Sequence, residues 1–243
     1  MSSARVRALG IGAAAIAAAV GLWQLSSEAG PRPLPARPPE QRPALVLLTS
    51  LPLVFGEGFS LQHNGSPALT ALQRRYRVVP ISVADPPELA RGRLLLMAQP
   101  SAQPAEDLVA LDRWVRSGGR VMLLADPMLE WPSKRPLGDL LRPAPMFMDT
   151  GLLAHWGLRL DAPDERGPDT AKLGGFEVLT DSPGRLFGKC AISGDRLVAH
   201  CAVGRGKATV VADADLLDTA SLGHRSSRNL DGVLQELARL EHS

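Results

Sequence analysis

Three aspartates occur in a sequence context that would place their carboxylates together at one edge of a sheet. Asp126 ends the phrase Gly119–Asp126 (GRVMLLAD), and Asp213 ends the similar phrase Gly206–Asp213 (GKATVVAD), with Asp215 two residues further on. Each phrase has a glycine, a basic residue and an unbroken apolar run, which is typical of a strand covered on both faces. Because open α/β sheets bind ligands at the carboxyl ends of their strands, this edge is a candidate site.

These aspartates have two interpretations. Asp126 precedes Pro127, and Asp215 precedes an apolar pair and Asp218, so both fit helix N-caps, the preferred interpretation. Alternatively, Asp126, Asp213 and Asp215 converge to bind Mg²⁺ or a sugar. Hard cations usually need further oxygen ligands, which the sequence does not identify. No metal, cofactor or catalytic residue is therefore predicted.

Four further residues belong to the predicted ligand- or partner-binding set: Glu57, His63, Trp131, and Gln99, which follows the predicted strand 93–98. Glu57 and His63 lie in the loop 50–65 after the first predicted strand, and this loop could form a lid or pocket wall. The alternative is a glycine-rich loop that buries two phenylalanines, since no metal-binding spacing surrounds His63. Trp131 lies in an irregular stretch at 127–145, rich in proline and arginine, and loops of that length are often functional.

The order of the apolar runs predicts the fold that must position these residues. Strands are predicted at 44–49, 77–83, 93–98, 207–212 and in a run ending at 126, and helices at 66–76, from 104 to the Gly118–Gly119 stop, and at 227–240. A short helix and a short strand are predicted within 148–160. Strands at 176–180, 185–192 and 196–203 form an antiparallel hairpin excursion. The prediction is a three-layer α/β domain with a doubly wound, mostly parallel sheet.

Two cysteines bear on the compartment. Cys190 and Cys201 flank the turn signal Ser193–Asp195 between two strand-like runs, so a hairpin would place them opposite each other. A cross-strand disulfide is then geometrically plausible, and it would be expected outside a reducing cytosol. The alternative is two buried free thiols, because a one-residue slip in register would turn one of them away.

The N-terminal residues 1–29 are predicted to be a membrane anchor or a signal peptide. Residues 8–25 are apolar apart from Gln24, and as a helix they would reach ~27 Å, just enough for a bilayer core. Ser27-Glu28-Ala29 offers the small residues of a signal-peptidase site, so the segment is either retained as an anchor or cleaved. In both cases the domain is exported. A soluble alanine-rich helix is the remaining alternative.

The rest of the chain divides into a linker and one domain. Residues 30–43 contain six prolines, which favour an extended spacer, and 44–243 form a single extracytoplasmic domain. The predicted location is the bacterial inner membrane, crossed once, with the domain in the periplasm. The chain carries 27 basic and 25 acidic residues, a formal charge of +2. This balance gives no electrostatic case for a nucleic-acid partner.

Three phrases of this sequence resemble a known family. They are residues 111–127 (LDRWVRSGGRVMLLADP), 211–217 (VADADLL) and 229–234 (NLDGVL). They resemble the extracytoplasmic domain of ABC-type uncharacterised transport-system auxiliary proteins, including the gliding-motility-associated kind. The resemblance implies a fold similar to the class I glutamine-amidotransferase-like α/β sandwich. It also implies ABC permease or ATPase subunits as partners.

One departure from the amidotransferase pattern decides the functional expectation. Those enzymes carry a cysteine at a nucleophile elbow after a central strand, whereas here that strand is followed by Gln99, Pro100 and Ser101. Ser101 lacks a Gly-x-Ser-x-Gly setting. We therefore expect a membrane-tethered binding or accessory domain that is not an enzyme. The alternative is a periplasmic metal-dependent hydrolase or sugar-acting enzyme using Asp126, Asp213 and Glu57.

Overall fold

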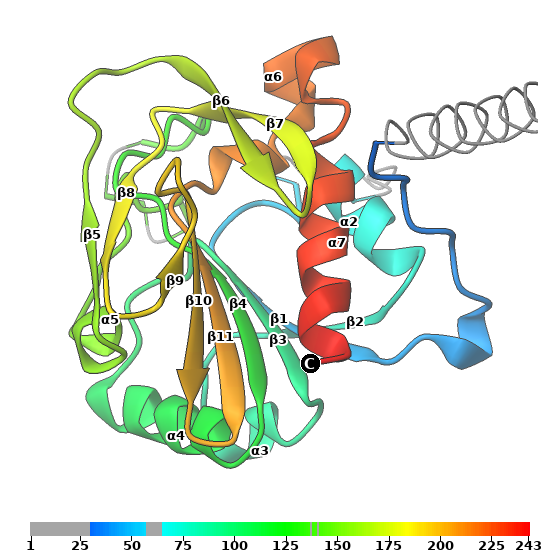
Figure 1. The fold of residues 1–243 in the computed structure, drawn as a ribbon, viewed down its shortest axis with the longest axis vertical. Helices are drawn as coiled ribbons and strands as arrows, with labels where there is room; N and C mark the ends of the chain where they lie inside the picture. Colours follow the sequence, from blue (N-terminus) through cyan, green and yellow to red (C-terminus); the bar gives the residue numbers. More distant parts are fainter. Residues whose placement is uncertain (1–29, 57–64, 137, 140) are drawn as a thin grey trace, which may run out of the picture. The chain divides into compact units, whose positions relative to one another are not determined.

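The computed structural model describes residues 30–56, 65–136, 138–139 and 141–243, and a compact unit begins at Leu34. Within these ranges the central sheet has seven strands in the order β2-β1-β3-β4-β11-β10-β9 (Figure 1). The strands are β1 (Ala44–Thr49), β2 (Arg77–Ile81), β3 (Leu94–Ala98), β4 (Arg120–Leu124), β9 (Ala191–Ile192), β10 (Val198–Val203) and β11 (Gly206–Val211). The first five strands in the order pair in parallel, and β10 and β9 extend the sheet antiparallel. The predicted doubly wound sheet is confirmed.

The two similar phrases of the sequence form neighbouring strands. β4 and β11 pair in parallel with Arg120 opposite Lys207 and Leu124 opposite Val211. The last four residues of each strand are buried, as expected for strands covered on both faces. The aspartates that follow these strands therefore lie close together at the carboxyl edge.

Helices cover both faces of the sheet. They are α2 (Pro67–Gln73), α3 (Pro86–Leu89), α4 (Ala105–Arg116), α5 (Leu152–His155), α6 (Thr219–Leu222) and α7 (Asn229–Glu241), with 3₁₀ turns η1 (Pro39–Gln41), η2 (Asp215–Leu217) and η3 (Gly223–Ser226). α2 contacts α7, and α3 contacts α4 (Figure 1). Right-handed crossovers from β1 to β2 and from β3 to β4 run in opposite directions along the sheet, so they place the two helix pairs on opposite faces. The predicted cap Ser66 accepts a hydrogen bond from the N–H of Leu69 at 3.0 Å.

Two small antiparallel pairs form the excursion. β5 (Leu158–Asp161) pairs with β8 (Arg185–Gly188), and β6 (Pro168–Leu173) pairs with β7 (Phe176–Asp181). β6 was not predicted, and the predicted strand 185–192 is divided between β8 and β9. The predicted disulfide between Cys190 and Cys201 is present, with a Cα separation of 4.8 Å.

Part of the predicted linker packs on the domain. The N–H of Arg37 donates to the carbonyl of Arg74 at 2.8 Å, and the guanidinium of Arg37 pairs with Glu241 at 3.0 Å. Burial, followed by the charge of Glu241, raises the pKa of the nearby Tyr76 to about 12. The compact unit thus starts nine residues earlier than the predicted linker ends, at Leu34 rather than after Pro43. The predicted anchor or signal segment at 1–29 lies outside the described residues, among which no helix is long and apolar enough to cross a membrane.

Candidate functional site at the carboxyl edge of the sheet

Gln99 occupies the turn directly after the central strand β3, the position at which the amidotransferases named above carry their nucleophile. Its backbone has a φ of 42°, a region that non-glycine residues rarely adopt. The side chain is fully buried, and its amide oxygen accepts from the N–H of Asp126 at 3.0 Å. Its amide nitrogen donates to the carbonyls of Asp126 and Ala144, both at 3.2 Å. Gln99 thus binds two loops of the edge together instead of facing a substrate.

The three aspartates named by the sequence come together after β4 and β11, but backbone N–H groups already occupy their oxygens. Asp126 accepts from Met128 and Ala214, both at 2.8 Å. Asp213 accepts from Leu216 at 2.7 Å and from Asp181 at 3.0 Å, and Asp215 accepts from Glu130 at 2.7 Å. The N–H groups that donate to these three carboxylates come from the loop after β4, the end of β7 and the segment after β11. The carboxylates therefore tie together segments that are far apart in sequence.

Burial makes these carboxyl groups hard to ionise. It is the largest cause that raises the pKa of Asp126 to about 6, and the charge of Asp181 adds to it. Burial and then the charge of Asp126 raise the pKa of Asp215 to about 8. The pKa of Asp213 is also raised well above its usual range, by burial and by the charges of Asp126 and Asp215. The backbone hydrogen bonds oppose these shifts without cancelling them.

The predicted helix caps are wrong in detail. Asp126 forms a turn with Met128 and caps no helix, and Asp215 is the first residue of η2. Asp213 instead accepts from Leu216 at the start of η2, and Asp218 caps α6 through the N–H of Ser221 at 3.1 Å. Local sequence could not decide between neighbouring aspartates, because each can accept from a backbone N–H two or three residues further on. Within the described part of the chain, no three carboxylate, imidazole or thiolate groups are placed to hold a metal ion.

An open pocket lies at the other half of the same edge. Its volume is about 440 Å³, and we call it the edge pocket. Its lining residues are Leu47, Thr49, Ser50, Leu51, Pro52, Val54, Phe55, Gly56, Pro80, Ile81, Ser82, Ser101, Arg135 and Leu141. Most of these residues lie in or directly after β1, β2 and β3, and Arg135 and Leu141 come from the loop after β4. The chain's strand order reverses between β1 and β3. Such a switch point is where open α/β sheets bind their ligands.

The edge pocket has a polar floor and an apolar rim. The hydroxyl of Thr49 donates to the carbonyl of Ala98 at 2.7 Å, and that of Ser50 donates to the carbonyl of Gln99, so both are satisfied internally. At the rim, the side chains of Phe55 and Leu141 are 83% and 68% exposed. Large apolar side chains exposed to water beside a cavity mark a surface whose burial by a partner is favourable in free energy.

The other predicted site residues divide into two groups. Glu57 and His63 lie outside the described residues. Trp131 is half-buried, packs against the core and does not line the edge pocket. Phe55 lies in the loop 50–65 that was predicted as a possible pocket wall, although it was not named as a site residue, and Ser82, Ser101 and Leu141 were not predicted. The signal that could have identified them is their position immediately after β1, β2 and β3, or in the long loop after β4.

Comparison with solved structures identifies the fold. The chain superposes on the N-terminal domain of mmIFT52 with a TM-score of 0.51 and 12% identity, covering 79% of this chain and 96% of that domain. It superposes equally on the cytoplasmic protein STM3548 from Salmonella typhimurium, with a TM-score of 0.51 and 11% identity, over 82% and 98% of the two chains. The fold is that of the class I glutamine-amidotransferase-like domains. At these identities the likeness concerns the fold alone.

Parts of larger proteins match this chain with lower TM-scores. The exo-beta-1,4-mannosidase Op5Man5 from Opitutaceae bacterium strain TAV5 matches with a TM-score of 0.48 and 14% identity over 82% of this chain. The chain spans only 36% of the length of that enzyme and 30% of the GH42 beta-galactosidase Gan42B. No protein-family model and no curated protein sequence matches the chain.

Proposed function

We propose that this chain is an extracytoplasmic binding domain without hydrolytic activity, which holds a partner protein through an apolar side chain inserted into the edge pocket. The observation that carries this proposal is the exposure of Phe55 and Leu141 beside a cavity of about 440 Å³ at the switch point of the sheet. Interface energy concentrates where an apolar anchor fills such a pocket and excludes water.

The rest of the carboxyl edge supports a binding function over hydrolysis. The position of a nucleophile holds Gln99, whose side-chain amide is buried and hydrogen-bonded on both sides. Asp126 and Asp213, the carboxylates that a metal-dependent hydrolase would use, each accept two backbone hydrogen bonds. Neither group is free to orient water or a substrate.

The kind of partner follows from the sequence resemblance. The phrases at 111–127, 211–217 and 229–234 resemble auxiliary domains of ABC-type transport systems, so we propose a permease or ATPase subunit of such a system as the partner. The disulfide between Cys190 and Cys201 supports an oxidising compartment, in which the domain would meet an extracytoplasmic part of the permease. The predicted anchor at 1–29 would hold it at the membrane.

The test is mild cross-linking of the full-length chain in its native membranes, followed by identification of the captured proteins. We expect an ABC permease or ATPase to be recovered with the wild type, and about tenfold less with Phe55→Ser combined with Leu141→Ser. Val109→Ser is the matched control, because Val109 is 57% exposed on α4 away from the pocket. Equal recovery with all three chains would refute the role of the edge pocket. Recovery of no transporter subunit would refute the proposed partner.

A further inference from the structure

The hairpin of β6 and β7 ends in an open strand edge. Both strands contact α7, and β6 pairs with no strand other than β7 among the described residues. In an antiparallel pair, alternate residues turn their N–H groups away from the neighbouring strand. On β6 these residues are Thr170 and Lys172. The N–H of Thr170 donates to the carboxylate of Asp169 at 2.7 Å, and the N–H of Lys172 donates to that of Asp195 at 3.0 Å. Two carboxylate oxygens therefore stand where the carbonyl oxygens of another strand would be.

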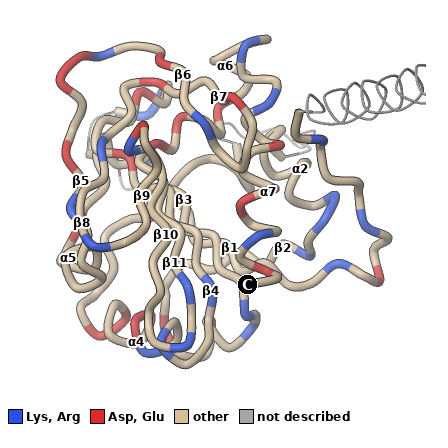
Figure 2. The backbone as a smooth tube through the Cα atoms, in the orientation of Figure 1, with Lys and Arg blue, Asp and Glu red and all other residues tan. Residues whose placement is uncertain are grey.

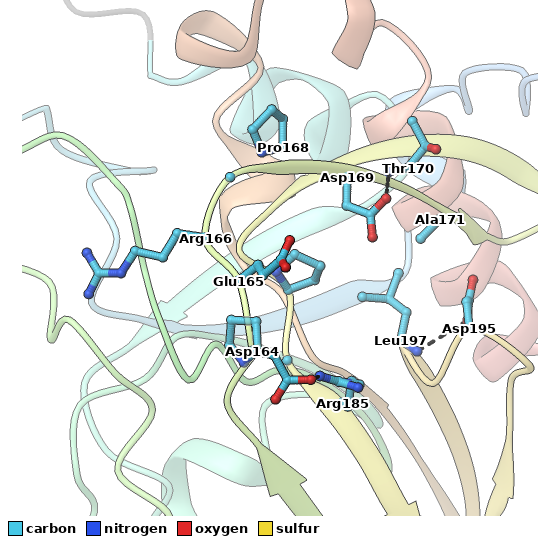
Figure 3. A pocket seen from close by; sticks show the side chains of 14 residues that line it. Asp164, Glu165, Arg166, Pro168, Asp169, Thr170, Ala171, Arg185, Asp195 and Leu197 are labelled. Atoms are coloured by element: carbon cyan, nitrogen blue, oxygen red, sulfur yellow. Dashed lines mark hydrogen bonds and ion pairs between the residues drawn. The ribbon is translucent and has the colours of Figure 1, made fainter.

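A hollow of about 610 Å³ lies beside this edge, and we call it the β6 trough. It is lined by residues 163–171, 183–185, 195 and 197 (Figure 3). The part of β6 that borders it, 168–171, is about 13 Å long at ~3.3 Å per residue. That length accepts about four residues of an extended peptide.

The β6 trough carries an excess of negative charge. The guanidinium of Arg185 pairs with Asp164, and Arg166 points away from the hollow in Figure 3, towards Glu130 at 3.7 Å. The side chains left facing the trough are Glu165, Asp169 and Asp195. None of these three forms an ion pair with a described lysine or arginine. Figure 2 shows the acidic residues gathered along the loop between β5 and β6.

The carboxylate of Asp195, which lines the β6 trough, is held in its ionised form. Burial alone would raise the pKa of Asp195, but hydrogen bonds from the hydroxyl of Ser193 and the N–H groups of Lys172 and Leu197 outweigh it and lower the pKa. Because three donors already hold the carboxylate of Asp195 in place, it needs little rearrangement to pair with a cation.

We propose that the open edge of β6 receives an extended, lysine- or arginine-rich segment of a partner protein as a third strand. A carbonyl of that segment replaces the carboxylate of Asp169 at the N–H of Thr170, and its basic side chains pair with Glu165 and the released Asp169. Strand addition gives affinity through the main chain and specificity through alternate side chains. A two-stranded sheet is only marginally stable, so a third strand also stabilises the hairpin. This surface is separate from the edge pocket, and the inference does not depend on the proposed function.

The experiment measures binding of a fluorescein-labelled octapeptide of alternating lysine and valine to the full-length chain in a neutral detergent. We expect saturable binding that weakens about tenfold in Thr170→Pro, which removes one N–H where an edge strand tolerates proline. A similar loss is expected for Glu165→Lys combined with Asp169→Asn. Asp107→Lys in the first turn of α4 is the matched control and should bind like the wild type. Urea unfolding of each variant checks that it folds.

Three outcomes would overturn the inference. One is the absence of binding to the wild type at about 1 mM peptide, and another is equal binding of an alternating glutamate and valine peptide. The third is unchanged affinity in Thr170→Pro, because binding would then be electrostatic adsorption without strand addition. If Thr170→Pro does not fold, hydrogen exchange in the wild type decides. Bound peptide must slow exchange of the Thr170 amide, and unchanged exchange refutes the proposal.

Discussion

At the scale of single residues, polar side chains at the carboxyl edge serve mainly as connectors. Asp126 binds the N–H of Ala214, 88 positions further along the chain, and Gln99 binds the backbone of Asp126 on both sides. The apolar runs were enough to predict that Asp126, Asp213 and Asp215 lie at one edge. Their partners could not be predicted, since the donors come from loops that only the tertiary fold brings near.

Gln99 provides a direct test of this connecting role. We expect Gln99→Ala to lower the free energy of unfolding by about 2 to 4 kcal/mol, because it opens a cavity and leaves the N–H of Asp126 and the carbonyl of Ala144 without partners, while the carbonyl of Asp126 keeps its bond from Phe147. The loss is measured by urea unfolding followed by circular dichroism. Gln103→Ala is the control: Gln103 also makes two backbone hydrogen bonds but is only half-buried, so the loss should be about 1 kcal/mol. An equal loss in both variants would contradict the role given to Gln99.

At the scale of elements, the disulfide fixes the edge of the sheet. It joins β10 to the residue before β9, where β9 pairs with only two residues of β10. Closing a loop with a sequence separation of 11 removes unfolded-state entropy worth about 3 kcal/mol. The double variant Cys190→Ala and Cys201→Ala should therefore unfold at a lower urea concentration than the wild type. A reductant should lower the midpoint of the wild type but not that of the variant. Wild-type midpoints that agree with and without reductant would show that the bridge contributes nothing.

The contact between the β6–β7 hairpin and α7 depends on a helical glycine. A Cβ at Gly232 would lie 2.8 Å from the carbonyl oxygen of Leu173 and 3.1 Å from a methyl of Val178. Alanine normally stabilises a helix interior by about 1 kcal/mol relative to glycine. Here we expect Gly232→Ala to destabilise by about 1 to 3 kcal/mol, because the hairpin must move away. Thermal unfolding measures the change, with Gly194→Ala as control since a Cβ there meets open space. A stabilised Gly232→Ala protein would show that the hairpin does not press on α7.

The elements could be predicted where apolar runs are long and bounded by clear signals. β1, β3, β4 and β11 were found because they are continuous and buried, and α4 because its apolar face ends at Gly118 and Gly119. β6 was missed because most of its residues are exposed, so it lacks an apolar pattern. The Gly174–Gly175 turn that joins it to β7 was an available hairpin signal.

At the scale of the whole described unit, the carboxyl edge has a closed half and an open half. Over β4 and β11, Asp126, Asp213 and Asp215 are buried and hold the surrounding loops. Over β1, β2 and β3 the edge pocket is open, with Phe55 and Leu141 at its rim. The hydrogen-bonded loops over β4 and β11 thus support the edge pocket, but burying the three carboxyl groups costs free energy of folding. That cost depends on pH, because protonated carboxyls are cheaper to bury than ionised ones.

The sign of this dependence follows from the direction of the shifts. A carboxyl group whose pKa is higher in the folded state binds its proton more tightly there, so stability is lost as the pH rises from the unfolded pKa to the folded one. For Asp126 this range ends at about 6, and for Asp215 at about 8. Burial lowers the pKa of His200, which acts in the opposite direction, but only below the ordinary histidine value of about 6.5. Between pH 6.5 and 8 the buried aspartates therefore dominate.

We expect the free energy of unfolding to fall by about 1 to 2 kcal/mol between pH 6.5 and 8, since each proton taken up on folding contributes a slope of about −1.4 kcal/mol per pH unit. Asp215→Asn should reduce this slope, with the raised pKa of Asp213 accounting for the remainder, and it should be the more stable protein at pH 8, because an amide oxygen still accepts from the N–H of Glu130 and position 215 buries no charge. Glu106→Gln, which removes an exposed carboxylate from α4, should keep the wild-type slope. Urea midpoints at four pH values measure all three. A wild-type midpoint that rises with pH in this range would mean that the aspartates are ionised in the folded protein, and that backbone hydrogen bonds outweigh their burial.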